Sequence, residues 1–209
     1  IQFSSPDYAA RAIWRNGLGW LDGVDWTGWG WAISVSFDNF TSFHINGDDP
    51  MARLPYLDKD DLKDEDKDLL ARNINLHRLL AHSPGAARSF GELGKYIRYG
   101  TTMDARLREL AILQVGWLAK SPYEWSHHVK IGKDFGVTDD DIHALIAESN
   151  GENSGLPELD RLVLRAGREI TIDGAVAADT FSALEGHMSK EHLVDLTVTI
   201  AFYNAVARF

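Results

Sequence analysis

The chain has 209 residues, of which 44% are apolar and 11% aromatic, so it is long enough to bury a hydrophobic core. Its formal net charge of -10 argues against a nucleic-acid partner, since phosphate backbones are bound by clustered Lys and Arg. It has no cysteine, no basic and apolar leader pattern and no run of about 18 apolar residues, so we expect a cytoplasmic protein without disulfides or a membrane partner.

Residues 1–50 differ in composition from the rest of the chain. They hold most of the tryptophans, and the alternating pattern of WAISVSF and TSFHI favours a β-hairpin. From residue 51 onward the pattern becomes helical, after the charge-dense lead-in LDKDDLKDEDKD. We therefore expect an N-terminal extension of unknown role over 1–50 and an all-α domain over 51–209.

Start and stop signals divide this domain into a succession of helices. Their expected ranges are 64–81, 84–98, 104–119, 122–134, 138–148, 157–170, 175–186 and 190–208. The expected N-caps are Ser83, Asp104, Ser121, Thr138 and Ser189, because their side-chain oxygens can accept free backbone N–H groups.

A weak internal repeat relates two of these helices. RLRELAILQVGW, at 106–117, aligns with HLVDLTVTIAFY, at 192–203, and places Glu109 on Asp195. Amphipathic periodicity alone produces part of such a likeness. The repeat favours a domain of two weakly related halves.

A cluster of ionisable residues stands in SPYEWSHH, at 121–128. Ser121 and Glu124 fit a capping box, in which the glutamate reaches back to the Ser121 amide. This role explains Glu124 without any catalysis, but it does not explain His127 and His128, which can share the same helical face. A helix N-terminus also favours a carboxylate or a substrate anion nearby. The cluster fits either a capped helix start or an acid–base site.

Glu109 adds a second carboxylate, upstream of the cluster. Ile112 and Leu113 follow one turn later, so the carboxylate points along an otherwise apolar stripe. Burial there would raise the pKa of the carboxyl and prepare it as an acid or base for neutral pH. The alternatives are a pair with Arg106 or Arg108, or exposure at the helix margin.

One segment resembles a known family. Residues 108–142 read RELAILQVGWLAKSPYEWSHHVKIGKDFGVTDDDI, which is similar to the central motif of the carboxymuconolactone decarboxylase family, a family that includes the AhpD-like alkylhydroperoxidases. The resemblance extends more loosely over residues 60–209 and includes NLHRLLAHSPGAARSF before the motif. It does not cover residues 1–50. The resemblance implies an AhpD-like helical domain.

The AhpD-like peroxidases carry a Cys-x-x-Cys followed four residues later by histidine. Ser121 and Glu124 occupy those cysteine positions here, whereas His128 and Glu109 match the family's histidine and glutamate. A hydroxyl and a carboxylate cannot cycle through a disulfide, so the resemblance implies the fold and the proton-handling residues without thiol peroxidase chemistry. The decarboxylase branch, which also lacks the redox pair, fits better.

We therefore expect a lyase that acts on a small anionic carbonyl compound, such as a carboxylated lactone. Decarboxylation leaves a carbanion or enolate that must be stabilised and protonated. His128 is the expected proton donor or anion stabiliser, with Glu124 orienting it and Glu109 tuning or relaying the proton. The expected substrate contacts are the neighbouring residues His127, Ser121 and Trp125.

Other readings remain open. No cofactor is expected. Glu109, Glu124, His127 and His128 do have the residue types of a metal site. However, adjacent histidines project about 100° apart on a helix, which makes joint ligation awkward. A noncatalytic small-molecule binder or a structural oligomer would use the same residues. The resemblance implies a homo-oligomer, commonly a trimer or a hexamer, and IAFYNAVARF, at 200–209, has more apolar positions than one buried stripe needs.

Overall fold

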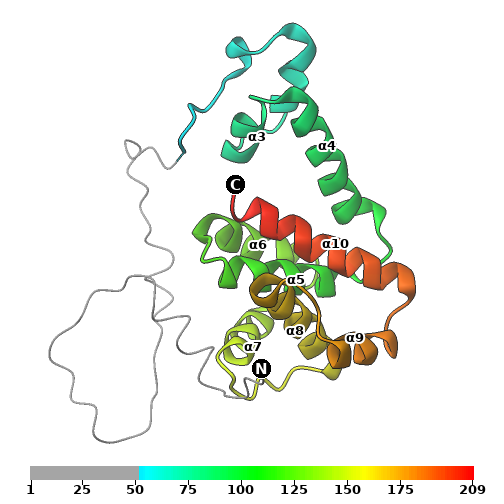
Figure 1. Cartoon of the computed structure of the whole chain (residues 1–209). Coiled ribbons are helices and arrows are strands. Elements are labelled where there is room, and N and C mark those ends of the chain that lie inside the picture. Colours follow the sequence, from blue (N-terminus) through cyan, green and yellow to red (C-terminus); the bar gives the residue numbers. More distant parts are fainter. Residues whose placement is uncertain (1–51) are drawn as a thin grey trace, which may run out of the picture. The chain divides into compact units, whose positions relative to one another are not determined.

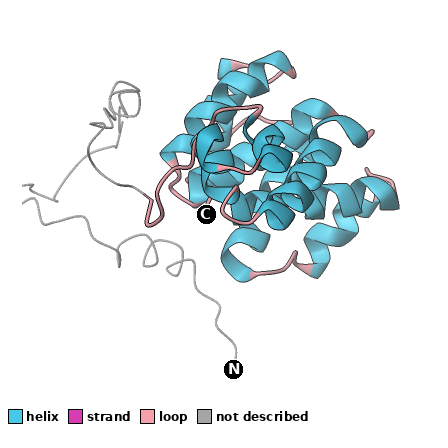
Figure 2. Cartoon of the chain, turned by 90° about the horizontal axis from the view of Figure 1, so that it is seen from above, coloured by secondary structure: helices cyan, strands magenta, loops and turns pink. Residues whose placement is uncertain are grey.

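The structure is a computed structural model that describes residues 52–209. These residues form helices and loops and include no strand (Figure 1) (Figure 2). The elements are η1 (Lys59–Asp61), η2 (Asp64–Leu70), α3 (Asn75–Leu80), α4 (Pro84–Lys95), the π-helical turn η3 (Tyr96–Gly100), α5 (Ala105–Leu118), α6 (Pro122–Asp134), α7 (Asp139–Ser149), α8 (Glu158–Asp173), α9 (Ala178–Glu185) and α10 (Lys190–Val206). The predicted all-α class is confirmed, whereas the predicted extension and hairpin of residues 1–50 lie outside the described residues. None of the helices in this part of the chain has the length and apolar character that a membrane crossing requires.

The single helix predicted over 64–81 is wrong. The chain instead forms η2 as a 3₁₀ segment and then α3, joined by a link in which Ile74 is extended, with φ −115° and ψ 151°. Arg88 of α4 binds the carboxylates of Asp66 and Asp68, so charge holds the acidic segment against α4. The segment has too few apolar residues to form the core-facing stripe that stabilises a longer α-helix.

The predicted N-caps form with one exception. Asp104, Ser121, Thr138 and Ser189 each accept a hydrogen bond from the backbone amide three residues further along. Thr138 also takes part in the reciprocal bonds of a capping box. Ser83 makes no such side-chain bond, and proline at the first helical position starts α4 in its place.

Helix α5 forms the centre of the described domain. Every residue from Leu107 to Gly116 is buried, and α5 contacts α6, α8 and α10 (Figure 1). A helix buried on all sides needs packing partners on all sides. Gly116 allows α6 to approach closely, because a Cβ there would lie 3.4 Å from the backbone nitrogen of Trp125. The close approach brings the ionisable residues of α6 next to those of α5.

The two helices related by the predicted repeat, α5 and α10, pack against each other. Their aligned acidic residues, Glu109 and Asp195, are 1% and 5% exposed. A buried charge is tolerated only when hydrogen bonds or opposite charges compensate for its lost hydration. Glu109 accordingly binds His128 and Arg108, and Asp195 binds Tyr96 and Thr101.

Candidate active site

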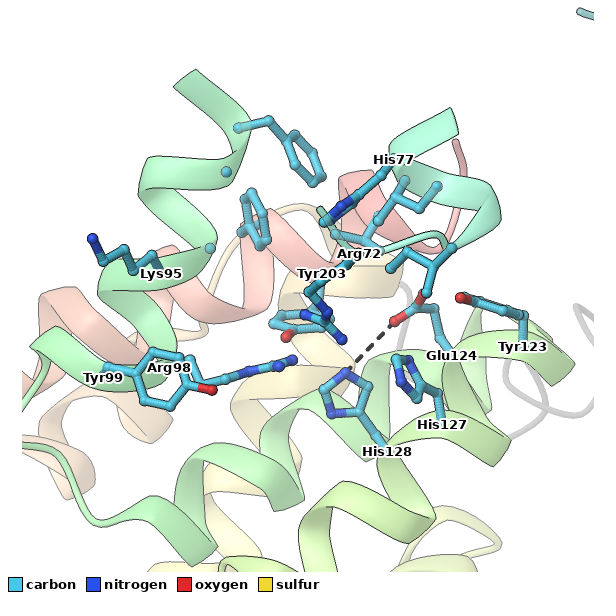
Figure 3. Close-up of a pocket in the computed structure, with 17 residues that line it drawn as sticks. Arg72, His77, Lys95, Arg98, Tyr99, Tyr123, Glu124, His127, His128 and Tyr203 are labelled. Carbon is cyan, nitrogen blue, oxygen red and sulfur yellow. Dashed lines mark ion pairs between the residues drawn. The ribbon is translucent and has the colours of Figure 1, made fainter. Parts of the chain in front are cut away.

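A pocket of about 260 Å³ lies where four parts of the domain meet (Figure 3). Its walls come from the link before α3 with α3 itself, from α4 with η3, from the first half of α6 and from the last turns of α10. Leu76, Phe90, Phe202 and Val206 form an apolar part of the wall. The remaining wall is rich in ionisable and phenolic side chains, and these determine what the pocket can do.

His128 lines this pocket and stands between two carboxylates. Its Nδ1 lies 2.8 Å from Oε2 of Glu109. On the other side, its Nε2 faces Glu124 (Figure 3), whose Oε2 lies 3.7 Å away. An ionised carboxylate only accepts hydrogen bonds, so Nδ1–H donates a hydrogen bond to Glu109. This bond sets the orientation of the imidazole ring. The other nitrogen, Nε2, is left to exchange a proton with Glu124 or with a molecule in the pocket.

Glu109 is further held by Arg108, its neighbour on α5. The guanidinium donates from Nε and Nη2 to Oε1 of Glu109, at 3.2 and 3.0 Å, and from Nη1 to the carbonyl of Arg98, at 3.2 Å. It also lies over the ring of Phe135, 4.5 Å from the centroid. Such a hydrogen-bonded and stacked pair suits arginine rather than lysine. Glu109 therefore pairs with Arg108, one of the alternatives predicted, and also supports His128.

The two carboxyls beside His128 have pKa values shifted in opposite directions. Burial by itself would raise the pKa of Glu109, but the hydrogen bonds and charges of His128 and Arg108 bring it below its ordinary value. Burial raises the pKa of Glu124, and the positive charges of His128 and Arg98 only partly offset that rise. A pair of carboxyls separated in this way can serve as a fixed anion and an exchangeable proton carrier.

Tyr203 of α10 packs its ring edge against His128, with centroids 4.9 Å apart and planes at 88°. Burial raises the pKa of Tyr203 to about 12, although the neighbouring Arg98 opposes the rise. The phenol therefore stays neutral across the physiological pH range and can donate one hydrogen bond. Together with Glu109, it limits the movement of the imidazole.

The pocket has an excess of positive charge, in a chain whose formal net charge is -10. Arg72, Lys95 and Arg98 line it, together with three histidines, and Glu124 is the only carboxylate among the lining residues. Within residues 52–209, neither Arg72 nor Lys95 forms an ion pair. Charges that have no protein partner in a concave site favour an anionic ligand.

Only one of the three predicted substrate contacts lines the pocket. His127 lines the pocket, where burial first and then nearby positive charges lower its pKa. Ser121 and Trp125 do not line it. Trp125 is buried on the side of α6 that faces α5, 5.2 Å from the ring of Trp117, so its predicted role as a substrate contact is not supported by its position.

Ser121 acts as a helix cap, and only half of the predicted capping box forms. Its hydroxyl accepts a hydrogen bond from the Glu124 amide at 3.4 Å. The Ser121 amide donates to the carbonyl of Gly116 at 3.1 Å, so it does not need the Glu124 side chain. The Glu124 carboxylate is thereby left to face His128, and the capping interpretation does not account for it.

Sequence reasoning missed the cations and phenols that complete the pocket. Arg72, Lys95, Arg98 and Tyr203 lie outside the motif, and no spacing rule connects them with His128. The repeat did align Tyr203 with Trp117, which marked the end of α10 as a counterpart of the motif helix. The clustering of Tyr, Arg and Tyr before Gly100 was a weak further signal.

The residues described do not form a metal site. No group of three or more His, Asp or Glu side chains in residues 52–209 has the arrangement needed to hold a metal ion. In the set weighed from the sequence, both oxygens of Glu109 are already hydrogen-bonded, Oε1 to Arg108 and Oε2 to Nδ1 of His128.

Comparison with known proteins adds the family. Residues 84–150 match the model of the carboxymuconolactone decarboxylase family. This segment belongs to that family. It runs from α4 to the end of α7 and contains Glu109, Glu124 and His128, so the carboxymuconolactone decarboxylase segment supplies the imidazole and both of its carboxylates. None of the curated proteins in the comparison matches the chain.

Two solved structures share the fold. The first, from Agrobacterium tumefaciens, is a protein of unknown function with a suggested role as antioxidant defence protein AhpD; it is 25% identical, and the match covers 62% of this chain and 88% of that one, with a TM-score of 0.54. The second, from Ralstonia eutropha JMP134, is described as an alkylhydroperoxidase AhpD core and an uncharacterised peroxidase-related protein; it is 18% identical, with coverage of 77% and 88% and a TM-score of 0.62. The carboxymuconolactone decarboxylase segment therefore lies in an AhpD-like helical fold, in a chain without cysteine.

Proposed function

We propose that this protein is a non-redox lyase that binds a small organic anion and catalyses acid–base chemistry next to a carbonyl group, with decarboxylation as the leading reaction. The arrangement of His128 carries the proposal. Its Nδ1 is 2.8 Å from Glu109, and its Nε2 faces Glu124 beside a pocket lined by arginine and lysine. An oriented imidazole, an exchangeable carboxyl and spare positive charge are the groups that such a reaction needs.

Binding would begin with the positive charge of the pocket. Arg98 extends toward His128, so a substrate carboxylate or enolate oxygen held by its guanidinium would lie near the imidazole (Figure 3). Arginine suits this role because its planar fork can donate two hydrogen bonds to one carboxylate. The apolar side chains Leu76, Phe90 and Phe202 would contact the carbon skeleton. A volume of about 260 Å³ restricts the ligand to a small molecule.

The chemical step needs one proton delivered to carbon. When the bond to the carboxylate carbon breaks, carbon dioxide leaves and the electron pair stays on the substrate as an enolate. A proton from Nε2 of His128, or from Glu124 beside it, then forms the new C–H bond, and a proton taken up from solvent replaces it. Glu109 keeps Nδ1–H in place and remains ionised, which stabilises the imidazolium before it gives up its proton. The geometry thus favours Glu109, rather than Glu124, as the residue that orients His128.

Thiol peroxidase chemistry is outside this proposal. Ser121 caps α6 and Glu124 faces His128, so the two positions that correspond to the redox cysteines hold a hydroxyl and a carboxylate. Neither group forms a disulfide. We expect no thiol-dependent peroxide reduction by the purified chain, and robust turnover in such an assay would contradict the assignment.

The test of the proposal measures carbon dioxide release from a panel of small carboxylated lactones and β-keto acids. On any substrate that turns over, His128→Gln should lower kcat by about 10²- to 10⁴-fold, the usual contribution of a general acid or base. His187→Gln is the matched control, because His187 does not line the pocket. Anion binding without turnover on the whole panel would favour a noncatalytic binder. Equal activity in the two variants would remove His128 from the mechanism.

A further inference from the structure

We infer that Asp195, on α10, is a positioning residue for the pocket, because it holds both ends of the π-helical turn η3 that carries Arg98 into the pocket wall. Its Oδ1 accepts a hydrogen bond from the hydroxyl of Tyr96 at 2.9 Å, and its Oδ2 accepts one from the hydroxyl of Thr101. Tyr96 is the first residue of η3, and Thr101 directly follows its last residue. One buried carboxylate therefore holds the two ends of a five-residue turn.

The turn is shaped to allow this attachment. A Cβ on Gly100 would lie 2.6 Å from Cδ2 of Tyr96, so the tyrosine ring can cover the end of the turn only because residue 100 has no side chain. The Thr101 hydroxyl, which donates to Asp195, also accepts a hydrogen bond from the amide of Met103 at 3.0 Å. π-Helical turns are rare in proteins and are frequent at functional sites.

The residues between the two anchors face the pocket. Arg98 and Tyr99 both line it, and the carbonyl of Arg98 accepts from Nη1 of Arg108 at 3.2 Å. Because Arg108 also binds Glu109, the turn is tied on one side to the carboxylate behind His128 and on the other side to Asp195. The position of the Arg98 charge thus depends on a residue that does not itself line the pocket.

This inference rests on the proposed function only for the role of Arg98 in binding a substrate anion. The position of Arg98 can therefore be tested without a substrate. His127 reports on that charge, because its pKa is lowered by burial first and then by His128, Arg72, Arg98 and Lys130. If the guanidinium withdraws from the pocket, the pKa of His127 should rise. The measurement is a histidine NMR titration of the full 209-residue chain, with the resonance assigned by His127→Gln.

Three variants give the expected result. Arg98→Gln should raise the pKa of His127. Because it removes the charge altogether, its shift is the upper limit for the other two variants. Asp195→Asn and Tyr96→Phe should raise it in the same direction by a large part of that shift. Neither should raise it further when Arg98→Gln is already present, because the charge that they displace is then absent.

Thr102→Val provides the matched control. Thr102 Oγ1 lies 3.0 Å from Nε2 of His192, so this variant removes a contact between the same two segments without touching η3. Its His127 pKa should match that of the parent chain. An unchanged His127 pKa in Asp195→Asn and Tyr96→Phe would overturn the inference, as would an unchanged value in Arg98→Gln. If Asp195→Asn does not fold, Tyr96→Phe decides, since the Tyr96 side chain is 42% exposed.

Discussion

Glu109 and Glu124 lie on opposite sides of one imidazole, and their surroundings give them opposite electrostatic roles. Glu109 is ionised and compensated by His128 and Arg108, which keep its pKa low despite its burial. Glu124 is buried with weaker compensation, so its charged form is disfavoured and its pKa is raised. In the folded chain, the first carboxylate supports the imidazole and the second holds a proton more readily than an exposed glutamate does.

The free energy of unfolding should therefore respond to pH with opposite signs in the two isosteric variants. Glu109 contributes stability above its unfolded pKa, near 4.5, and loses it as the pH falls through the lower folded value, so Glu109→Gln should cost about 3 kcal/mol at pH 7 and less in acid. Glu124 has a raised folded pKa, so its ionisation lowers stability as the pH rises above about 4.5. Glu124→Gln should thus gain stability relative to the parent chain between pH 4 and pH 7.

Urea unfolding of both variants and the parent chain at several pH values measures these differences. The two variants control for each other, because both replace a buried carboxylate beside the same histidine with an amide of equal size. Parallel pH profiles for the two would contradict the assigned roles.

At the scale of elements, the packing of α8 against α5 depends on a glycine. A Cβ on Gly167 would lie 3.0 Å from Cγ of Gln114, a fully buried side chain whose Oε1 accepts from Ser149 at 3.1 Å and from Arg168 at 3.4 Å. These bonds restrict the movement of Gln114. The interface therefore has little room for even one methyl group.

Gly167→Ala should lower the free energy of unfolding by about 1 kcal/mol, because the overpacking of a buried interface outweighs the gain in helix propensity. Gly91→Ala is the matched control in α4, where a Cβ would meet nothing within 4 Å. It should instead stabilise the chain by roughly 0.5 to 1 kcal/mol. Urea midpoints for the two variants check the prediction, and equal shifts of the same sign would show that packing at Gly167 does not matter.

At the scale of the whole molecule, the apolar end of α10 is less available to a partner than its sequence indicated. Ile200, Tyr203 and Val206 are buried within the described domain. Other large apolar side chains remain exposed, including Val194 at 60% and Ile172 at 64%. Exposed apolar side chains of this size are candidates for a contact between copies of the chain.

We expect a homo-oligomer, without assigning its symmetry. Sedimentation at micromolar concentration should report a mass well above the 23.3 kDa of one chain. Val194→Lys should shift the distribution toward smaller species if this part of α10 lies in the interface, because burying an ammonium group there is unfavourable. A single species of monomer mass across the concentration range would refute the expectation.

The sequence by itself determined the local features of this protein. The caps at Asp104 and Thr138 and the start of α6 follow from hydrogen bonds that span three residues, so nearby residue types suffice to predict them. The motif with Glu109, Glu124 and His128 pointed to the family, and the absence of cysteine removed its redox branch. The error over 64–81 arose because the acidic segment has too few apolar residues for a core-facing stripe, and its carboxylates bind Arg88 of α4 instead.

Only the tertiary structure decided how these residues work together. The Glu109 to His128 bond spans 19 residues and the Tyr96 to Asp195 bond spans 99, so both depend on how the helices pack around α5. The same packing buries the Trp125 side chain in the core and places Arg98 in the pocket wall. Helical periodicity predicts which face of a helix is buried, but it does not specify which distant side chain will meet that face. That is why the motif was legible in the sequence and the charge of the pocket was not.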